Sequence, residues 1–303
     1  MQINLPNFFI IGAAKSGTTG LFDVLLQHPQ IYVPYLKETR FFSDDEKYQL
    51  GLEWYCQTYF NQSGKFKARG EATPHYLYWG DKTSSRLLKM TNSNKIKIIA
   101  IFRDPVKRAY SQYWMQVHRG VEPLSFEEAL KIEDQNLREN QVRLEKSGSL
   151  QYGYFHGGCY ASLLKPYLER FDWNNTGFFL LDDIKNNFST TMVKICQLLE
   201  VDEHFAFKPS VSNQAFVPRS KRIHHYLNNP SGVVYQTIRY FIRKTPPSFQ
   251  YRFRQKFLGL NTKPSQNPPL DNKTETNLRL RFQPEVEKLE VILDRNLDHW
   301  KVK

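Results

Sequence analysis

The sequence predicts an α/β fold, a single domain over residues 1–303 with a central parallel sheet flanked by helices. Two apolar runs, Phe8–Ile11 and Lys95–Phe102, carry this prediction. Each run is too short for a helix, is rich in strand-forming residues and is followed by a segment with helical features. Continuous apolar strands of this kind are typical of parallel sheets that are buried on both faces. A chain of 303 residues can also bury one large core.

The other elements are expected in an order that suits such a sheet. Leucines at helical spacing place a helix after the first run, at Leu21, Leu25 and Leu26. Pro105 fits the first turn of a helix with Asp104 as its cap, and this helix is expected to end near Arg119. The remaining segments are expected as strands or strand ends at 30–34, 69–74 and 178–184, and as helices at 51–60 and 84–90.

The composition excludes several classes of protein. Apolar residues make up 40% of the chain and aromatic residues 15%, which excludes a disordered or fibrous protein. No apolar run is long enough to span a bilayer, and the N-terminal residues lack the basic region and cleavage site of a signal peptide. The three cysteines Cys56, Cys159 and Cys196 lie far apart without metal-ligand spacing. We therefore expect a cytoplasmic protein with reduced thiols and no metal.

The net charge of +12 is concentrated in one stretch, residues 204–270. This stretch contains no Asp or Glu and eleven Lys or Arg residues, so it carries +11 of the total. Such a block indicates an anionic partner: a nucleotide, an acidic acceptor, a nucleic acid or a membrane surface. A solvated basic face without any partner is the alternative.

The loop after the first strand, Gly12–Thr19, has the composition of an anion-binding loop. A strand, a glycine-containing loop and a helix turn backbone N–H groups and the positive end of the helix towards a bound anion. Lys15 adds a cation, and hydroxyl donors follow at Ser16, Thr18 and Thr19. The lysine precedes Gly17, so the loop of nucleotide triphosphatases is excluded, and the glycine spacing excludes the Rossmann motif. We interpret the loop as a phosphate or phosphosulfate cradle; an ordinary strand-to-helix turn is the alternative.

A second motif follows the second apolar run. Arg103 comes directly after this run, and Ser111 lies two turns along the next helix. A guanidinium group together with a hydroxyl suits a terminal phosphate monoester. A third polar segment, 37–42, follows the expected strand at 30–34, and it would place its charged residues near the same edge of the sheet.

Together, K-S-G-T-T at 15–19 and R-D-P-x-x-R-x-x-S at 103–111 resemble the motifs of sulfotransferases that use 3′-phosphoadenosine 5′-phosphosulfate (PAPS). The resemblance is to the bacterial and carbohydrate-modifying branches of this superfamily. It runs from Phe8 to Ser111 and continues more weakly at 157–171, 178–184, 213–222 and 297–300. It implies a P-loop-like phosphosulfate site and PAPS as co-substrate, with adenosine 3′,5′-bisphosphate as the product.

The resemblance also implies roles for individual residues. The 5′-phosphosulfate would be held by the loop residues Lys15, Ser16, Gly17, Thr18 and Thr19. The 3′-phosphate would be bound by Arg103 and Ser111, and the basic segment 218–222 would contact the nucleotide through Arg219 and Lys221.

Catalysis by in-line transfer needs a cation at the leaving oxygen and a base for the acceptor. Lys15 suits the first role. Glu38 stands where carbohydrate sulfotransferases carry a catalytic glutamate, in a similar K-E-x-x-F-F context, and we favour it as the base over His75. The chain departs from those enzymes at Ala72, where they have a lysine before the Thr-Pro pair. Further polar side chains in these two segments would assist or pair with one another: Lys37, Arg40 and Glu71.

These observations favour a PAPS-dependent sulfotransferase that modifies a hydroxyl or an amine of a small molecule, as in the tailoring of natural products in secondary metabolism. The first alternative acceptor is a saccharide or glycolipid, with the 204–270 block binding its anionic groups or a membrane face. The second alternative is a nucleotide- or nucleic-acid-binding module without catalysis, because aromatic residues are interleaved with the basic ones in this block. For the enzyme we expect no nucleic-acid partner. The sequence does not encode the acceptor or the oligomeric state in a readable way.

Overall fold

The computed structural model describes residues 4–34, 37–91, 95–133, 153–209, 216–218, 262–264 and 267–302. By its internal contacts the chain divides into two units, Met1–Ser210 with Pro269–Lys303, and Val211–Pro268. In the second unit, the described residues form an antiparallel pair of short strands, β6 (Phe216–Pro218) and β7 (Thr262–Pro264). The single domain expected over residues 1–303 stays a prediction.

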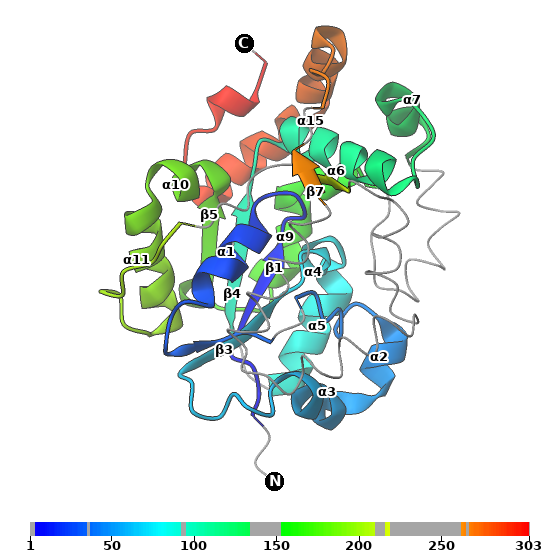
Figure 1. Ribbon diagram of the computed structural model, residues 1–303. Helices are drawn as coiled ribbons and strands as arrows, with labels where there is room; N and C mark the ends of the chain where they lie inside the picture. Colours follow the sequence, from blue (N-terminus) through cyan, green and yellow to red (C-terminus); the bar gives the residue numbers. More distant parts are fainter. Residues whose placement is uncertain are drawn as a thin grey trace. The chain divides into compact units, whose positions relative to one another are not determined.

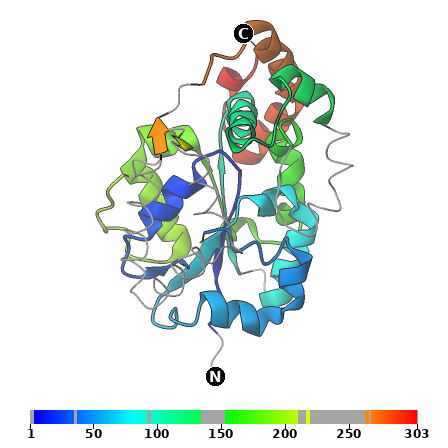
Figure 2. The same ribbon diagram turned by 45° about the vertical axis from the view of Figure 1, so that its right-hand side comes forward.

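Five strands form the central sheet of the first unit (Figure 1). They are β1 (Phe8–Gly12), β2 (Ile31–Tyr32), β3 (Ala68–Ala72), β4 (Lys97–Phe102) and β5 (Thr176–Leu180). Their order is β2-β3-β1-β4-β5, and every pairing is parallel. The predicted α/β fold with a central parallel sheet is therefore confirmed. Figure 2 shows the carboxyl ends of the strands at the top of the sheet, on the side of helix α6 (Pro105–Arg119).

The side chains on the two faces of β1 pack into two different hydrophobic cores. Phe8 and Ile10 belong to one cluster of buried apolar residues, and Phe9 and Ile11 belong to the other. Since successive side chains of a strand point to opposite faces, this alternation explains why the run is apolar without interruption. Each of these side chains is fully buried, which contributes roughly 1.5–3 kcal/mol per residue.

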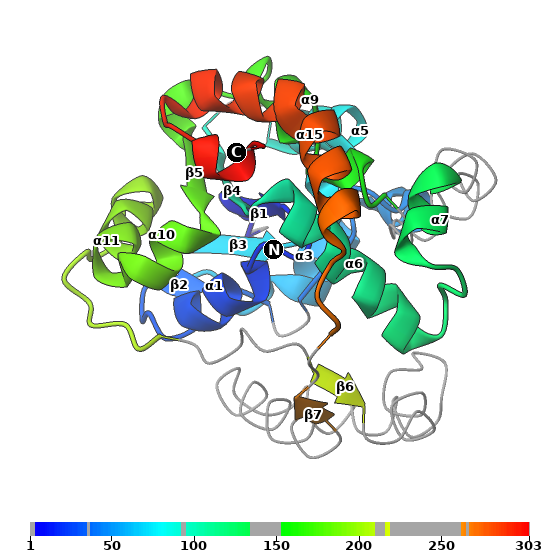
Figure 3. The same cartoon turned by 90° about the horizontal axis from the view of Figure 1, so that it is seen from above.

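Helices cover both faces of the sheet (Figure 3). One side carries α1 (Thr18–Leu25), α10 (Leu181–Asn186) and α11 (Phe188–Leu199). The other side carries α9 (Tyr160–Leu168) and the long C-terminal helix α15 (Asn272–Leu293). The first unit also contains α2 (Asp45–Gln49), α3 (Gly51–Tyr59), α4 (His75–Tyr78), α5 (Gly80–Thr91), α7 (Phe126–Lys131) and single 3-10 turns at His156–Gly158, Trp173–Asn175 and Asp298–Trp300.

Most of the elements expected from the sequence are confirmed, with one correction. The helices expected at 51–60 and 84–90 are α3 and α5. The segment 178–184 is not one strand, because β5 ends at Leu180 and α10 begins at the next residue. The Asp183 carboxylate accepts a hydrogen bond from the Leu180 backbone N–H at 3.2 Å. Acidic residues in a first turn favour the positive end of a helix, so this aspartate starts a helix where the apolar run suggested more strand.

Two findings concern the chain as a whole. All three cysteines are free thiols, and burial raises the pKa of Cys56 and Cys196 to about 11. Of the helices in the described ranges, none combines the length and the apolar character that crossing a bilayer requires.

Candidate active site

The strand order places a reversal between β1 and β4. The chain leaves β1, builds β2 and β3 on one side of it, and then crosses to β4 on the other side. In open α/β sheets, ligands bind outside the carboxyl ends of the strands at such a reversal. Hydrogen bonds beyond the regular strand pairing join these segments: Ala13 N, just after β1, donates to Ile101 O of β4 (2.8 Å), and Thr73 N, just after β3, donates to Ile10 O of β1 (3.1 Å). The segments that follow β1, β3 and β4 therefore meet at one edge.

The loop after β1 turns sharply into helix α1. Gly17 has a φ of 92°, and a Cβ at this position would lie 2.6 Å from Cδ1 of Leu181, so glycine is required on both counts. No side chain of the described residues caps the first N–H groups of α1, and its first turn carries no acidic residue. Thr18 is buried and Thr19 is exposed. The uncapped N–H groups and the positive helix end make this turn suitable for an anion.

Lys15 lies in this loop, with a φ of 69° and its Nζ 3.6 Å from Sδ of Met115 on α6. Its pKa is lowered to about 8, first because burial disfavours the charged form. Neighbouring positive charges lower it further, those of Arg119, Arg103 and Lys37. Lys15 is thus a protonated amine at pH 7 in surroundings that favour the arrival of negative charge.

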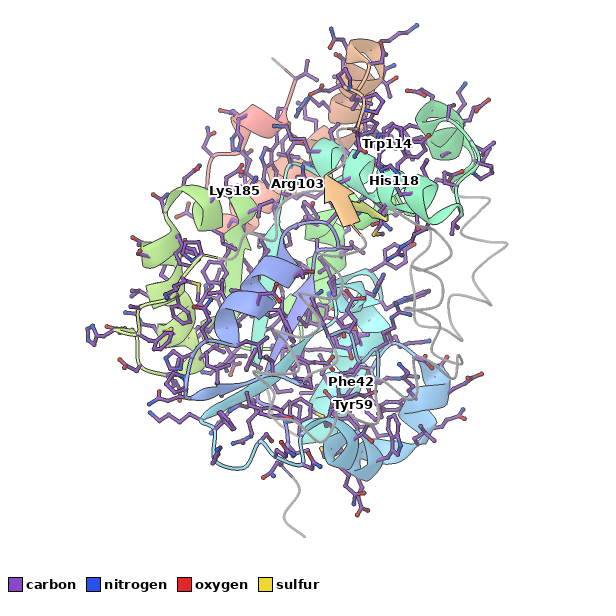
Figure 4. All side chains as sticks on the ribbon, in the orientation of Figure 1. Phe42, Tyr59, Arg103, Trp114, His118 and Lys185 are labelled. Carbon is purple, nitrogen blue, oxygen red and sulfur yellow. The ribbon has the colours of Figure 1, made fainter. Side chains whose placement is uncertain are left out.

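Arg103 reaches the same loop from β4. Its Nη1 donates to the backbone carbonyl of Lys15 at 3.3 Å, and its own carbonyl accepts from the Tyr160 hydroxyl at 2.9 Å. Figure 4 shows Arg103 near the upper end of the sheet. Ser111, its predicted partner, lies partly buried on α6. Lys15 and Arg103, expected at opposite ends of one nucleotide, therefore meet at a shared edge of the sheet.

The residue after Arg103 fixes the start of α6. Oδ1 of Asp104 accepts from Val106 N (2.9 Å) and Lys107 N (3.1 Å), as the sequence predicted for a cap. Its Oδ2 pairs with Nη2 of Arg279 on α15 at 2.9 Å. The C-terminal helix thus holds the residue next to Arg103.

Glu38 reaches the edge from the segment after β2. Its backbone N–H donates to Ala72 O at the end of β3 (3.1 Å), and its carboxylate pairs with Lys37 (3.0 Å) and Arg40 (3.9 Å). Burial raises the pKa of Glu38, but the charges of Lys37, His75 and Arg40 outweigh burial and hold this pKa at about 2. Glu38 is therefore a carboxylate in the ligand-free protein at any ordinary pH.

His75, the other predicted base, is the first residue of α4 and follows β3. Its Nδ1 is buried and has no hydrogen-bond partner among the described residues. Burial lowers the pKa of His75 to about 4; the Glu38 carboxylate opposes this shift, and nearby cations add to it. His75 is thus a neutral imidazole beside Glu38 at pH 7.

The sequence also suggested that Glu71 would assist or pair with charged neighbours. Instead Glu71 is fully buried, and its carboxylate accepts hydrogen bonds from four hydroxyl groups of surrounding side chains. Burial raises the pKa of Glu71, and these hydrogen bonds oppose that shift. Glu71 therefore contacts the segment 37–42 through the Thr39 hydroxyl.

Arg119 is a candidate site residue that the motifs did not single out. It is the last residue of α6, and its charge lowers the pKa of both Lys15 and His75. Burial lowers the pKa of Arg119 itself, and the Glu38 carboxylate opposes this. Its position on α6 was the signal that could have identified it. This helix begins next to Arg103 and contacts Lys15 through Met115, so the residue four positions after Met115 lies one turn further along the same helix.

Two predicted nucleotide contacts, Arg219 and Lys221, lie outside the described residues, as does most of the basic stretch 204–270. The described donors nevertheless fit a doubly phosphorylated nucleotide. They combine the uncapped N-terminus of α1 with two cations at the strand reversal, Lys15 and Arg103. Phosphate and sulfate oxygens accept from such donors.

Comparison with known proteins identifies the family. The sulfotransferase domain family matches residues 5–245. The crystal structure of a sulfotransferase from Alicyclobacillus acidocaldarius superimposes with a TM-score of 0.69 at 25% identity, over 98% of this chain and 99% of that one.

Curated relatives match shorter parts of their own length. A membrane-associated sulfotransferase of Dictyostelium discoideum is 40% identical over 115 residues, which cover 37% of this chain and 23% of that protein. The heparan sulfate glucosamine 3-O-sulfotransferase 5 of Mus musculus is 37% identical over 119 residues, 39% of this chain and 32% of the relative. This chain thus spans a third or less of these two relatives. Since the family match covers most of the chain, and the bacterial structure shares its fold almost from end to end, the chain belongs to the sulfotransferase domain family.

Proposed function

We propose that this chain transfers a sulfuryl group from PAPS to a hydroxyl or amine of an acceptor. One observation carries the proposal: the Arg103 guanidinium donates to the Lys15 carbonyl, which supports a single site built from the two predicted anion-binding motifs. Family membership supports the same reaction. A site for a single doubly phosphorylated nucleotide needs cations at both of its ends, and this juxtaposition supplies them.

On the donor side, residues 15–19 and the N-terminus of α1 bind the 5′-phosphosulfate. Arg103 and Ser111 bind the 3′-phosphate, and Arg219 and Lys221 add contacts from the basic segment. In the reaction, a bond forms between the acceptor oxygen or nitrogen and sulfur, and the bond between sulfur and the 5′-phosphate oxygen breaks. Lys15 neutralises the charge that develops on this leaving oxygen, and adenosine 3′,5′-bisphosphate is released.

Glu38 accepts the proton of the acceptor. Its side chain is 31% exposed and its carboxylate is ionised, so it is ready to accept a proton. Its left-handed backbone, with a φ of 65°, is the kind of strain that is found at functional sites. A base with a pKa of about 2 is weak, but four or so negative charges on a bound nucleotide would raise the pKa of Glu38 and of His75.

For the acceptor we propose a saccharide hydroxyl or amine, because one curated relative is named as a heparan sulfate glucosamine 3-O-sulfotransferase and another as a heparan sulfate N-sulfotransferase. The small-molecule acceptor expected from the sequence is the second candidate. It is favoured by Ala72, which stands where carbohydrate sulfotransferases resembling this chain carry a lysine. The cytoplasmic location, the absence of a metal and the absence of a nucleic-acid partner stay predictions.

The test is a transfer assay with PAPS labelled in its sulfuryl group, against a panel of glucosamine-containing saccharides, alcohols, phenols and amines. Binding of adenosine 3′,5′-bisphosphate is measured in parallel by calorimetry, at low salt and at about 0.5 M salt to separate specific from screened contacts. We expect labelled product with at least one class, and weaker nucleotide binding in Arg103→Ala. Equal nucleotide affinity in wild type and Arg103→Ala would contradict the proposed site.

A further inference from the structure

Glu71 sits at the centre of a buried group of hydroxyls, which we call the hydroxyl cage: Thr39, Tyr55, Thr73 and Tyr76. Its Oε2 accepts from Thr39 (2.7 Å) and Thr73 (2.8 Å). Its Oε1 accepts from Tyr55 (2.7 Å) and Tyr76 (2.9 Å). All five residues are fully buried. Each carboxylate oxygen thus receives two hydroxyl protons, and the direction of all four protons is fixed inwards.

The other side of the hydroxyl cage faces the segment 37–42. Three successive backbone N–H groups donate to its oxygens: Arg40 to Thr73 (3.4 Å), Phe41 to Thr39 (3.3 Å) and Phe42 to Tyr76 (3.3 Å). A hydroxyl has one proton and two lone pairs, so it can accept from the backbone only while its proton points elsewhere. Glu71 takes these protons, and it thereby keeps three acceptors turned towards the backbone.

This segment needs to be held. Glu38 and Arg40, the residues on either side of Thr39, both have left-handed backbones, with φ values of 65° and 59°. This conformation is unfavourable for a residue with a side chain, because Cβ comes too close to the following carbonyl oxygen. Without the hydrogen bonds on residues 40–42, the chain has a local reason to relax to ordinary φ values. Such relaxation would move Glu38 away from the edge of the sheet.

We propose that Glu71 is a positioning residue for the reaction: through the hydroxyl cage it holds the strained segment 37–42 and so keeps Glu38 at the carboxyl edge of the sheet. The inference rests on the proposed function for the role of Glu38. The hydrogen bonds and backbone angles that support it stand independently of that role. Glu71 itself is fully buried, so its carboxylate is not exposed at the edge of the sheet where the substrates are expected.

Substitution of Glu71 by glutamine distinguishes this role from simple packing. An amide has the same shape, but its NH₂ group donates and cannot accept. The two hydroxyls that face the NH₂ group must turn their protons outwards. In either orientation of the amide, at least one of them is a hydroxyl that accepts from a backbone N–H of residues 40–42. Because the amide fills the same volume as the carboxylate, no cavity is created. Any effect of the substitution therefore comes from the changed directions of the hydroxyl protons.

The experiment compares four variants: Glu71→Gln, Thr39→Val, Thr39→Ser and Thr83→Val. Thr39→Val removes one cage hydroxyl at nearly constant shape, and Thr39→Ser restores it. Thr83 is the matched control, because it is a fully buried threonine whose hydroxyl bonds to Tyr76 O and the Tyr167 hydroxyl, with no contact to Glu71. Backbone hydrogen exchange of residues 40–42, kcat with the best acceptor of the panel, and the Kd of adenosine 3′,5′-bisphosphate are measured for each.

We expect Glu71→Gln and Thr39→Val to lose exchange protection at residues 40–42 and to lower kcat by about 10–100-fold, the scale of a misplaced catalytic group. Thr39→Ser should recover the exchange protection and kcat, and Thr83→Val should change neither quantity. The nucleotide Kd should stay within about twofold of wild type in all four variants, because the donor-binding loop and the hydroxyl cage lie on different sides of β1.

Unchanged protection and unchanged kcat in Thr39→Val would overturn the proposal, even if Glu71→Gln fails to fold. An equal loss of kcat in Thr83→Val would also overturn it. If wild type neither binds the nucleotide nor transfers sulfate, the proposed function fails, while the exchange data still decide whether Glu71 holds the segment.

Discussion

The two sides of strand β1 present differently charged groups at the same edge of the sheet. On the β4 side, Lys15 and Arg103 are cations whose partners among the described residues are not acidic: the lysine Nζ contacts a methionine sulfur, and the arginine donates to a backbone carbonyl. On the β3 side, Glu38 is paired with cations, and its segment is held by buried hydrogen bonds. One side is left open to a charged ligand, whereas the other is fixed before any ligand arrives.

This difference follows from what each side has to do. A site for a highly charged nucleotide gains from cations that the protein itself has not neutralised, even though burial makes them costly, as the lowered pKa of Lys15 indicates. A base has to stand in line with the acceptor, so its position matters more than its charge. The β4 side therefore depends on electrostatics, and the β3 side depends on rigidity.

The largest effect should come from the β4 side. Lys15→Ala removes the cation expected at the leaving oxygen and should lower kcat/KM by about 10³-fold, the upper range for loss of one group that stabilises developing charge. The assay is transfer of labelled sulfuryl at saturating acceptor. Lys89→Ala, an exposed lysine on α5, is the control and should be neutral. Activity within about tenfold of wild type would remove Lys15 from the chemical step.

The buried charge of Lys15 should also lower the free energy of unfolding of the ligand-free protein. Its folded pKa of about 8 lies below the ordinary value of 10.5, so the unfolded chain binds this proton more tightly and the charge opposes folding at pH 7. Stability should then rise as the pH passes from 8 towards 10.5, and Lys15→Met should raise the free energy of unfolding of the ligand-free protein at pH 7 while remaining inactive. Urea denaturation measures both. A less stable Lys15→Met variant would contradict this account of the loop.

On the β3 side, Glu38→Gln should lower kcat by about 10²-fold, as expected for loss of a general base, and should leave the Kd of adenosine 3′,5′-bisphosphate within about twofold. The nucleotide affinity separates the two sides of β1, because Lys15→Ala should weaken it and Glu38→Gln should not. His75→Asn is the matched variant. If Glu38→Gln keeps wild-type kcat and His75→Asn loses it, the histidine is the base.

The sequence indicated the local elements on both sides of β1 but not the contacts between distant segments, for a physical reason. Strand, loop and helix are local, so Phe8–Ile11 with Gly17 indicated where Lys15 lies, and Asp104–Pro105 indicated where α6 begins. The hydroxyl cage joins Thr39, Tyr55 and Glu71 from three separate segments, and no local pattern reports such a meeting. For the same reason, Arg119 at the far end of α6 was not identified.

The pH dependence of kcat/KM and of kcat tests whether the bound nucleotide contacts Lys15. In the free enzyme, kcat/KM for PAPS should fall above about pH 8, because Lys15 loses its proton there. The bound nucleotide is negatively charged and raises the pKa of Lys15, so the corresponding fall in kcat should lie at higher pH. Towards acid, the limit for kcat/KM is set in the free enzyme by His75 at about 4 and Glu38 at about 2, so kcat/KM should be level between pH 5 and 7. A fall in kcat and kcat/KM at the same alkaline pH would mean that the nucleotide does not contact Lys15.

The smallest effect concerns Arg119, whose charge acts on both sides of β1. Removal of this like charge in Arg119→Ala makes protonated Lys15 less unfavourable, so the alkaline fall of kcat/KM should move to higher pH. The same change raises the pKa of His75 towards its ordinary value. Since Arg119 acts through its charge, which salt and solvent screen in part, kcat at pH 7 should change only about threefold. Arg119→Lys keeps the charge and should keep the wild-type pH profile. An alkaline limb that stays in place in Arg119→Ala, or that moves equally in Arg119→Lys, would mean that this arginine does not link the two sides.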